Sequence, residues 1–411
     1  MVKRISKSPR RIKRISKSPR RITRVSKSPK SKFSKLTAQV ASKLKKFKQS
    51  PKQSPYLNEN VGIIMFHLPA KDRITWNTKV VYNNKPINIT YTRMKTPPFD
   101  MWFKSNLSAK LNVTIDKTDT NVFKILYNFR NNINGLAWNR NINKLSEEIG
   151  QFLNLQILFL SGNQLTQLPK AIGDLKNLQC LYIGDNKLKQ LPENIGNLKQ
   201  LQKLNLDDNE LTQLPESIGK LDNLQKLGLA HNKLTKLPES IGKLKRLETL
   251  CLNGNDLTQL TESIGELKNL QSLVLQLNEL TQLPKSIGYL TNLKGLYLGL
   301  NILSSLPDSI GHLTNLQILD LSGNKLTTLP ESFGQLKNLQ NLYLYNNILT
   351  SLPDSIGQLK NLEYLDISDN KLKQLPESIG HITKLKALYL DEKRFKSLPK
   401  SIKQLLKKTN K

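Results

Sequence analysis

The sequence repeats itself every 23 residues over its carboxy-terminal two thirds, and this repeat is the strongest constraint on how the chain folds. Residues 168–190, LPKAIGDLKNLQCLYIGDNKLKQ, return in close variants every 23 residues up to the unit that starts at Leu375. Counting the unit that starts at Leu145, eleven units follow one another without an insertion, and a half unit begins at Leu398. A unit this short cannot bury its apolar side chains alone, so neighbouring units must stack.

Within each unit, apolar residues alternate with others over a short stretch, as in a β-strand. In LQCLYIGDN, Leu181 and Ile183 alternate with Cys180, Tyr182 and Gly184. Side chains two residues apart lie on the same side of a strand, so we expect the first pair to face inward and the other three to face outward. The inward residues of successive units would then form one continuous core.

An asparagine follows each predicted strand, from Asn163 to Asn370 at every 23rd residue. The chain must turn away after the strand, which leaves backbone groups without partners, and an amide side chain has both donors and an acceptor to satisfy them. We therefore expect a column of asparagines inside the stack. The column breaks at Lys393, where solvent should take the place of the amide.

Proline and glycine columns mark the other side of each unit. Pro169 and its equivalents, with Thr261 as the exception, stand where a short helical segment would begin, and proline is tolerated there because the amide that it lacks has no helical partner. Gly150 and its equivalents permit either close packing or a positive φ. In the last half unit Lys403 replaces the glycine, and we expect residues 401–411 to form a helix that caps the stack.

The repeats, written LPESIGKLxNLQxLxLxxNxLTxLP, resemble the 23-residue class of leucine-rich repeats found in intracellular proteins of the Ras-group and related scaffold type. The resemblance covers residues 145 to about 405. It implies an α/β fold, a right-handed horseshoe-shaped solenoid with a parallel sheet on its concave side and short helices or turns on its convex side. It also implies a role in binding other proteins.

The sequence predicts five segments. Residues 1–55 carry 20 Lys and Arg and no acid, and we expect them to form a disordered basic tail. Residues 56–133 contain five candidate strands, VGIIMF, TKVVYNN, INITYTR, LNVTI and FKILYNF, with a hairpin-like NNKP between the second and third, and predict a small β-rich region or cap. Residues 134–144 form a degenerate repeat, residues 145–397 hold the eleven repeats, and residues 398–411 hold the half repeat and the capping helix.

The outward strand positions and the residue before each asparagine differ between units, and they predict the binding surface. Aromatic and acidic side chains gather there, and Lys203 and Lys226 are the only bases. Tyrosine offers rigid contact area at a small entropic cost, and concentrated negative charge favours a protein partner with a basic surface. The candidate protein-binding residues are Phe159, Tyr182, Asp207, Asp208, Tyr297, Asp320, Tyr343, Tyr345, Tyr364, Asp366, Asp369, Tyr389 and Asp391.

This surface has a second interpretation, in which the same side chains are merely tolerated on an exposed sheet. Successive strands lie about 4.8 Å apart, so eleven units would offer a surface on the order of 50 Å long. That length fits a protein or a peptide rather than a small molecule.

The tail contains nearly the same ten letters twice, in RISKSPRRIKRISKSPRR at residues 4–21. Its two SPRR segments end in Arg10 and Arg11 and in Arg20 and Arg21, and they resemble the Ser-Pro-basic repeats of linker-histone-like tails. The resemblance implies non-specific contact with DNA or RNA, which would weaken as salt rises. A nuclear address, an incidental polycation and contact with an anionic membrane surface are the alternatives.

Three serines of the tail are candidate phosphorylation sites. Ser8, Ser18 and Ser28 each precede a proline and a basic residue, which suits proline-directed kinases. A phosphate adds about −1.5 to −2 charges, so three of them would cancel about a quarter of the positive charge of the tail.

No feature of the sequence predicts an enzyme. Neither GxxxxGK[ST] nor GxGxxG occurs, the four histidines do not cluster, and residues 1–144 hold no cysteine. We therefore expect no catalytic residue, no metal site and no cofactor. The chain has two cysteines and no apolar run typical of a signal peptide or a transmembrane segment, so we expect an intracellular protein of the cytoplasm or nucleus.

Together these features predict a non-enzymatic scaffold that binds a protein partner on its concave face, while the basic tail contacts nucleic acid or directs the protein to the nucleus. The alternative is an intracellular signalling scaffold of the Ras-group type whose tail has no role with nucleic acid. A salt titration of DNA binding with and without residues 1–55 separates the two.

Overall fold

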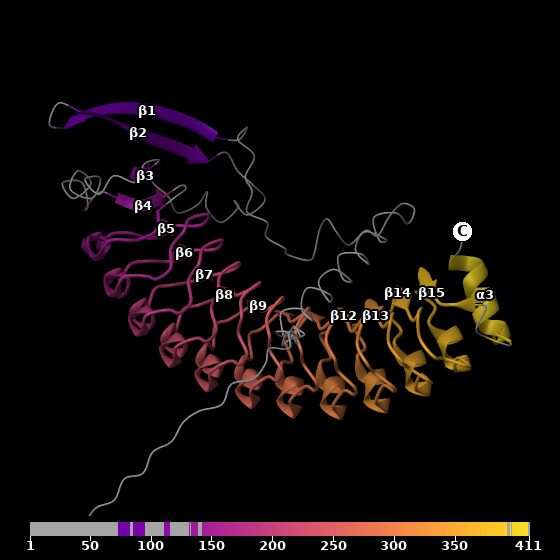
Figure 1. Cartoon of the computed structure of the whole chain (residues 1–411). Helices are drawn as coiled ribbons and strands as arrows, with labels where there is room; N and C mark the ends of the chain where they lie inside the picture. The colour runs from indigo at the N-terminus through magenta and orange to yellow at the C-terminus, as the bar shows by residue number, and fades with distance from the viewer. Residues whose placement is uncertain are drawn as a thin grey trace, which may run out of the picture. The chain divides into compact units, whose positions relative to one another are not determined.

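The structure is a computed structural model of the chain that describes residues 73–82, 85–94, 111–115, 131, 133–138, 142–392, 395 and 397–409. The predicted tail, the predicted strands at residues 61–66 and 123–129, and Lys393 lie outside the described residues. The fifteen strands among the described residues form one sheet, and their order in the sheet follows the chain from β1 to β15 (Figure 1).

Four strands precede the first full repeat. β1 (Arg73–Tyr82) and β2 (Lys85–Met94) pair antiparallel and cover most of the expected TKVVYNN and INITYTR segments. β3 (Leu111–Ile115), the expected LNVTI, pairs antiparallel with β2 and parallel with β4 (Ile133–Trp138). From β3 onward, neighbouring strands are parallel, so β4 takes the place of a strand from one further repeat before the first full one.

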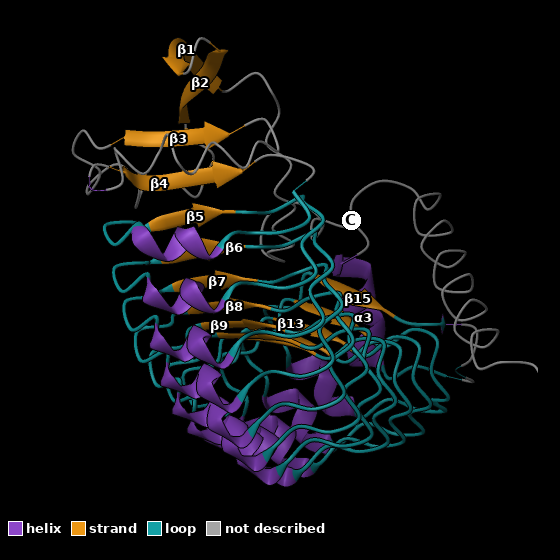
Figure 2. Cartoon of the chain, turned by 60° about the vertical axis from the view of Figure 1, so that its left-hand side comes forward, coloured by secondary structure: helices purple, strands orange, loops and turns teal. Residues whose placement is uncertain are grey.

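Each repeat contributes one three-residue strand and one five-residue 3₁₀ helix. The strands lie side by side on the inner side of a curved stack and the helices on its outer side (Figures 1 and 2). Strands β5 to β15 are Ile157–Phe159, Cys180–Tyr182, Lys203–Asn205, Lys226–Gly228, Thr249–Cys251, Ser272–Val274, Gly295–Tyr297, Ile318–Asp320, Asn341–Tyr343, Tyr364–Asp366 and Ala387–Tyr389. Helices η5 to η15 are Glu147–Gln151, Lys170–Asp174, Glu193–Asn197, Glu216–Lys220, Glu239–Lys243, Glu262–Glu266, Lys285–Tyr289, Asp308–His312, Glu331–Gln335, Asp354–Gln358 and Glu377–His381, and an α-helix, α3 (Lys400–Thr409), ends the described chain. The predicted solenoid with a parallel inner sheet is confirmed.

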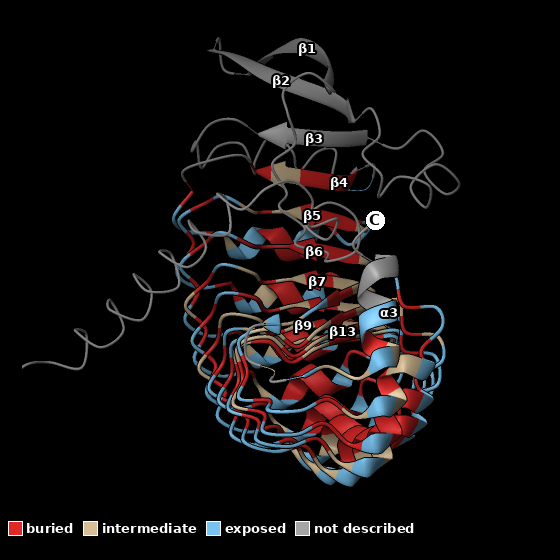
Figure 3. Cartoon of the chain, turned by 90° about the vertical axis from the view of Figure 1, so that its right-hand side faces the viewer, coloured by how far each residue is buried: buried red, intermediate tan, exposed pale blue. Residues whose placement is uncertain are grey.

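The core runs through the whole stack as parallel columns of leucine and isoleucine. In the third repeat, Leu201, Leu204, Leu206 and Leu211 are each at most 1% exposed, and the other repeats follow the same pattern (Figure 3). Burying one such side chain contributes about 2 kcal/mol. Because each column continues from one repeat to the next, no repeat holds a core of its own.

The asparagine column is buried and joins neighbouring turns, as predicted. Asn232 donates from Nδ2 to the carbonyl of Leu206 in the previous repeat (3.0 Å) and to that of Leu229 in its own repeat (3.2 Å). Its Oδ1 accepts a hydrogen bond from the amide of Leu211, also at 3.0 Å. Equivalent bonds recur from Asn163 to Asn370, so the side chain replaces the backbone partners that the turn removes.

The prolines stand immediately before the 3₁₀ helices rather than inside them. Pro192, for example, has an extended backbone (φ −70°, ψ 146°), and its carbonyl accepts the first bond of the helix from the amide of Ile195. Thr261, the exception, occupies the same position, and its Oγ1 accepts a hydrogen bond from the amide of Ser263 (3.4 Å). At Thr261 a capping hydroxyl therefore takes the place of the rigid φ of proline, whereas Ser146, at the same position of the first repeat, makes no such bond.

The convex glycines are required for close packing and not for a positive φ. A Cβ atom on Gly219 would lie 2.4 Å from the carbonyl oxygen and 2.7 Å from the Cβ of Ser240 in the next repeat. Most of the other convex glycines meet the following repeat in the same way. Of the two roles predicted for this column, close approach of the backbones is the one observed.

We expect Asn232→Ala to lower the free energy of unfolding by about 2–4 kcal/mol, because it leaves several buried backbone groups without a partner. Asn223→Ala is the matched control, since the Nδ2 of Asn223 makes its bond to the carbonyl of Lys199 (2.8 Å) at an exposed position. Urea unfolding followed by circular dichroism measures both values. Equal losses for the two variants would contradict a structural role of the buried column.

Candidate protein-binding face

The residues that face outward from β5 to β15, together with the residue two positions after each strand, form one surface on the inner side of the stack, here called the concave face (Figure 2). In β14, Tyr364 and Asp366 face outward, Leu365 faces the core and Ser368 is the residue two positions later. The predicted protein-binding residues lie along this face and on the turn that follows it. Their exposure and contacts differ from one end of the face to the other.

At the amino-terminal end, two aromatic side chains stack on each other. The rings of Phe159 and Tyr182 are parallel within 6°, with centroids 4.6 Å apart. Together with Ile157 and Cys180 they form a small apolar cluster on the concave face, and Tyr182 is only 8% exposed. Burial raises the pKa of both the Cys180 thiol and the Tyr182 hydroxyl. Tyr182 therefore faces outward, as predicted, but most of its surface is covered by its neighbours.

In the middle of the face, acids and bases lie close together. Lys203 and Lys226 are directly paired on β7 and β8, and burial lowers the pKa of Lys203. The carboxylate of Asp207 accepts hydrogen bonds from the backbone amide of Ala230 (2.8 Å) and from Nδ2 of Asn205 (2.6 Å). Burial is the main cause of the raised pKa of Asp207. The Asp207 carboxylate thus holds two neighbouring repeats together.

At the carboxy-terminal end, tyrosine and aspartate alternate along the sheet. Tyr297, Asp320, Tyr343, Asp366 and Tyr389 are direct partners in consecutive strands from β11 to β15. We call these five residues the Tyr–Asp ladder. The alternation has a period of two repeats, and it is visible when repeats seven and nine are compared with repeats eight and ten. Reading the repeats one at a time identifies the residues but misses this order.

Each aspartate of the ladder is held by a serine two residues later. Oδ1 of Asp320 accepts hydrogen bonds from the backbone amide (3.0 Å) and the hydroxyl (2.6 Å) of Ser322. Asp366 and Ser368 make the same two bonds at the same distances. Burial raises the pKa of Asp366, and these bonds to Ser368 oppose the rise. The sequence analysis assigned no role to these serines, although in both repeats a serine follows the aspartate two residues later.

The tyrosines of this end range from buried to exposed. Tyr297 is 6% exposed because its ring lies over Gly295, where a Cβ atom would be 2.9 Å from the ring. Tyr343 and Tyr364 are partly buried, and Tyr389 is 54% exposed. Burial also raises the pKa of Tyr345, whose side chain is hydrogen-bonded to Ser322. These rings therefore occupy set positions beside the aspartates.

Some of the predicted acidic residues stand in turns and have a backbone role. Asp208 and Asp369, like Asp185, have a φ near +55° and are the residues directly before the buried asparagines. Aspartate tolerates this left-handed conformation better than most residues. Asp391 accepts a hydrogen bond at Oδ2 from the amide of Asp369 (2.9 Å). Their charges still add to the field of the concave face.

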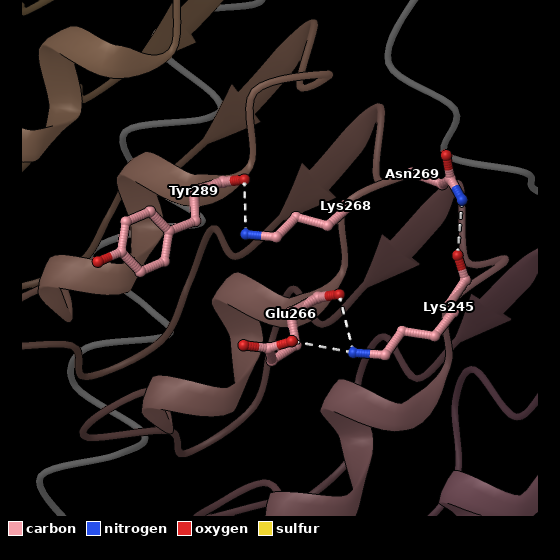
Figure 4. A network of polar contacts seen from close by, with 5 residues as sticks. All are labelled: Lys245, Glu266, Lys268, Asn269 and Tyr289. Atoms are coloured by element: carbon pink, nitrogen blue, oxygen red, sulfur yellow. Dashed lines mark hydrogen bonds and ion pairs between the residues drawn. The ribbon is translucent and has the colours of Figure 1, made fainter.

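Outside the concave face, polar contacts connect neighbouring repeats. Lys245 pairs with Glu266 (3.0 Å), Asn269 donates to the carbonyl of Lys245 (2.7 Å), and the ammonium of Lys268 lies 4.7 Å from the ring centroid of Tyr289 (Figure 4). A polar hollow of about 400 Å³ lies near the starts of β8 to β11; it is lined by Gln225, Arg246, Glu248, Asn269, Gln271, Asn292 and Lys294. The exposed Lys245–Glu266 ion pair and the Lys268–Tyr289 contact each contribute little to the stability of the fold.

The predicted nucleic-acid contacts Arg10, Arg11, Arg20 and Arg21 and the candidate phosphorylation sites Ser8, Ser18 and Ser28 lie outside the described residues. Among the residues that the structure does describe, no three His, Cys, Asp or Glu side chains are grouped so that they could hold a metal ion. None of the helices in that part of the chain is both long and apolar enough to span a membrane.

A family model described as a leucine-rich repeat region matches residues 135–208, 223–298 and 342–407, which together exceed half of the chain. The chain belongs to the leucine-rich repeat superfamily. Two further models, both described as leucine-rich repeats, match residues 291–349 and 200–221 of this leucine-rich repeat protein. No curated protein matches the chain. Proteins of this superfamily generally serve as scaffolds for protein–protein interaction.

Three solved structures illustrate what the chain resembles. A leucine-rich repeat protein of Leptospira interrogans is 38% identical over 76% of this chain and 85% of its own, with a TM-score of 0.59. The ectodomain of the plant membrane receptor kinase GASSHO1/SCHENGEN3 from Arabidopsis thaliana, in complex with CASPARIAN STRIP INTEGRITY FACTOR 2, is 27% identical over 72% of this chain and 42% of its own, with a TM-score of 0.50. The Toll–Spatzle complex of Drosophila is 25% identical over 71% of this chain and 43% of its own, with a TM-score of 0.55.

We expect both cysteines to resist alkylation in the folded protein. Cys180 is 1% exposed, and burial raises the pKa of the partly exposed Cys251 to about 12, so very little of the reactive thiolate forms there at pH 8. Iodoacetamide labelling at pH 8, followed by intact-mass measurement, should add nothing to the native chain within an hour and two groups in 6 M guanidinium chloride. Rapid labelling of the native chain would contradict the burial described here.

Proposed function

We propose that this leucine-rich repeat protein is a non-enzymatic scaffold that binds a protein partner with a basic surface, and that the partner contacts the Tyr–Asp ladder and the side chains beside it. The observation that carries the proposal is the alternation of tyrosine and aspartate over β11 to β15. Tyrosine is enriched among the residues that contribute most to binding at protein interfaces, and acids beside it favour a partner of opposite charge.

The charge of this end of the concave face supports a basic partner. At the outward strand positions and the residue before each asparagine position, repeats eight to eleven have five acids and no Lys or Arg; the acids are Asp320, Asp366, Asp369, Asp391 and Glu392. Lys325 and Lys371 come only after the buried asparagines of their repeats. Like charges that converge on one concave surface attract a partner of opposite charge and increase its rate of association.

The order of the side chains supports the same proposal. The serine bonds hold Asp320 and Asp366 in one orientation, and Tyr345 is hydrogen-bonded to Ser322. A partner that binds side chains already held in place loses less conformational entropy on binding. Two of the similar structures are complexes, one of a plant receptor ectodomain with CASPARIAN STRIP INTEGRITY FACTOR 2 and one of Toll with Spatzle.

We expect a full-length variant with Tyr343, Tyr345, Tyr364 and Asp366 all changed to alanine to lose its main binding partner in affinity capture from cell lysate, with at least a tenfold drop in recovery. The control variant, Thr249→Ala with Ser272→Ala, alters outward residues of β9 and β10 and should keep the partner. Quantitative mass spectrometry of the captured proteins measures both. Unchanged recovery with a folded fourfold variant, checked by circular dichroism, would place the binding surface elsewhere.

We also propose that the basic tail contacts nucleic acid non-specifically or directs the protein to the nucleus, and that Ser8, Ser18 and Ser28 regulate it by phosphorylation. The support is the charge of residues 1–55 and the spacing of the SPRR segments. An intracellular location, in the cytoplasm or nucleus, belongs to the same proposal. In the alternative, an intracellular signalling scaffold of the Ras-group type, the tail has no role with nucleic acid.

If the tail contacts nucleic acid, the full chain should bind a 30-base-pair DNA with an affinity that falls at least 100-fold between 50 and 200 mM salt, because each neutralised phosphate releases counterions. Removing residues 1–55 should abolish this binding. Fluorescence anisotropy with a labelled duplex measures it. Equal binding by both chains would favour the scaffold without a nucleic-acid role.

A further inference from the structure

Two leucines on neighbouring turns are exposed beside the Tyr–Asp ladder. Leu277 follows β10 and is 37% exposed, and Leu300 follows β11 and is 39% exposed. Ile302, two residues beyond Leu300, is 38% exposed. Consecutive turns are joined by backbone bonds, such as the one from the amide of Leu277 to the carbonyl of Gly299 (3.0 Å), so the two leucines stand on adjacent turns. We call Leu277 and Leu300 the leucine patch.

The two leucines occupy a backbone conformation that is unfavourable for leucine. Both have a φ of +58°, in the column of residues directly before the buried asparagines. The other described residues with a positive φ in that column are glycine, aspartate, histidine or asparagine, which tolerate the left-handed region better. Leucine is strained there, and more than a third of each residue remains exposed. A binding role would explain why the chain has leucine at these two turns.

The leucine patch is continuous with the ladder. Gln276, the residue directly before Leu277, donates a hydrogen bond from Nε2 to Oδ2 of Asp320 at 3.0 Å, across two strands. Gly299, directly before Leu300, makes room for the same carboxylate, since a Cβ atom there would be 2.9 Å from Oδ2 of Asp320. The residues that position the first aspartate of the ladder are therefore the chain neighbours of the two leucines.

The spacing of the ladder matches an extended polypeptide that runs across the strands. Asp320 and Asp366 lie on β12 and β14, two strand spacings apart, which is about 10 Å. A polyproline II segment has three residues per turn and advances about 3.1 Å per residue, so residues three apart lie on the same side and about 9 Å apart. Tyr343 lies between the two aspartates and would contact the backbone and intervening residues of such a segment.

We propose that the leucine patch and the Tyr–Asp ladder form one docking site for an extended basic segment of a partner protein, with an apolar side chain on Leu277 and Leu300 and cations three residues apart at Asp320 and Asp366. The inference rests on the proposed function and adds the class of segment, its direction across the sheet and its spacing. The charge of the ladder favours a basic segment over an acidic one, and the exposed leucines favour one that carries an apolar anchor.

The first test separates binding from folding. Leu277→Asn with Leu300→Asn replaces each leucine by a residue that Asn346 already provides in the same column, at a φ of +57°. We expect this variant of the full chain to unfold at an equal or higher urea concentration than the original chain, because strain is relieved. Its affinity for the probe peptide, which the next paragraph describes, should nevertheless be at least tenfold lower. Unchanged binding by the variant would overturn the role of the leucines.

The probe is a 12-residue peptide with one leucine followed, three or four residues later, by two lysines three residues apart, and its other residues are uncharged. The comparison peptide has the same composition with the two lysines adjacent, so only one of them can meet an aspartate at a time. Fluorescence anisotropy at 50 mM salt should show at least fivefold tighter binding of the first peptide. Asp320→Asn with Asp366→Asn should remove the difference, and Asp185→Asn, a turn aspartate at the other end of the face, should not.

The outcomes distinguish this inference from the function on which it rests. If both peptides bind equally and the Asp320 and Asp366 variant weakens both, the face binds basic segments without reading their spacing, and the inference is wrong while the proposed function stands. If neither peptide binds, the inference is also wrong, and the capture experiment with the alanine variant decides the proposed function separately. Tighter binding of the spaced peptide, lost in both the leucine and the aspartate variants, supports the inference.

Discussion

The hydrogen bonds of the buried asparagines are the interaction on which the rest of the structure depends. Each asparagine, as Asn186 shows, connects its own turn with the preceding turn through two carbonyls and one amide. A three-residue strand leaves too few backbone partners for the chain that departs from it, so a repeat is complete only beside its neighbour. An insertion would shift the amide away from these groups, which explains why eleven repeats keep one length.

This constraint commits most positions of a repeat to the interior and leaves few for recognition. The leucine columns fill the core, and on the convex side Gly219 and its equivalents permit each backbone to approach the next. The concave positions follow no single pattern in all repeats, and the chain uses them differently at its two ends. Near the start, Phe159 and Tyr182 cover each other, whereas from β11 onward tyrosines alternate with aspartates that are held by serine hydrogen bonds.

At the turn before each asparagine, the fold requires a backbone conformation that two of the residues present there disfavour. The backbone there needs a positive φ, and glycine, aspartate, asparagine and histidine meet that need at most of the described repeats. Leu277 and Leu300 do not, and both are exposed beside Asp320. A strained backbone at an exposed apolar residue is the kind of feature that points to a partner.

The 23-residue period, the alternation of Leu181 and Ile183 with their neighbours, and the column from Asn163 to Asn370 were enough to predict the solenoid, because each repeats one local requirement eleven times over. The same alternation also predicted which side chains face the concave side. It did not predict that Tyr182 and Tyr297 are buried there, or that Asp320 is held by Gln276. The direction of a side chain follows from its own strand, but its exposure and partners also depend on residues of other repeats, as Asp320 does on Gln276, 44 positions earlier, and only stacking brings these together.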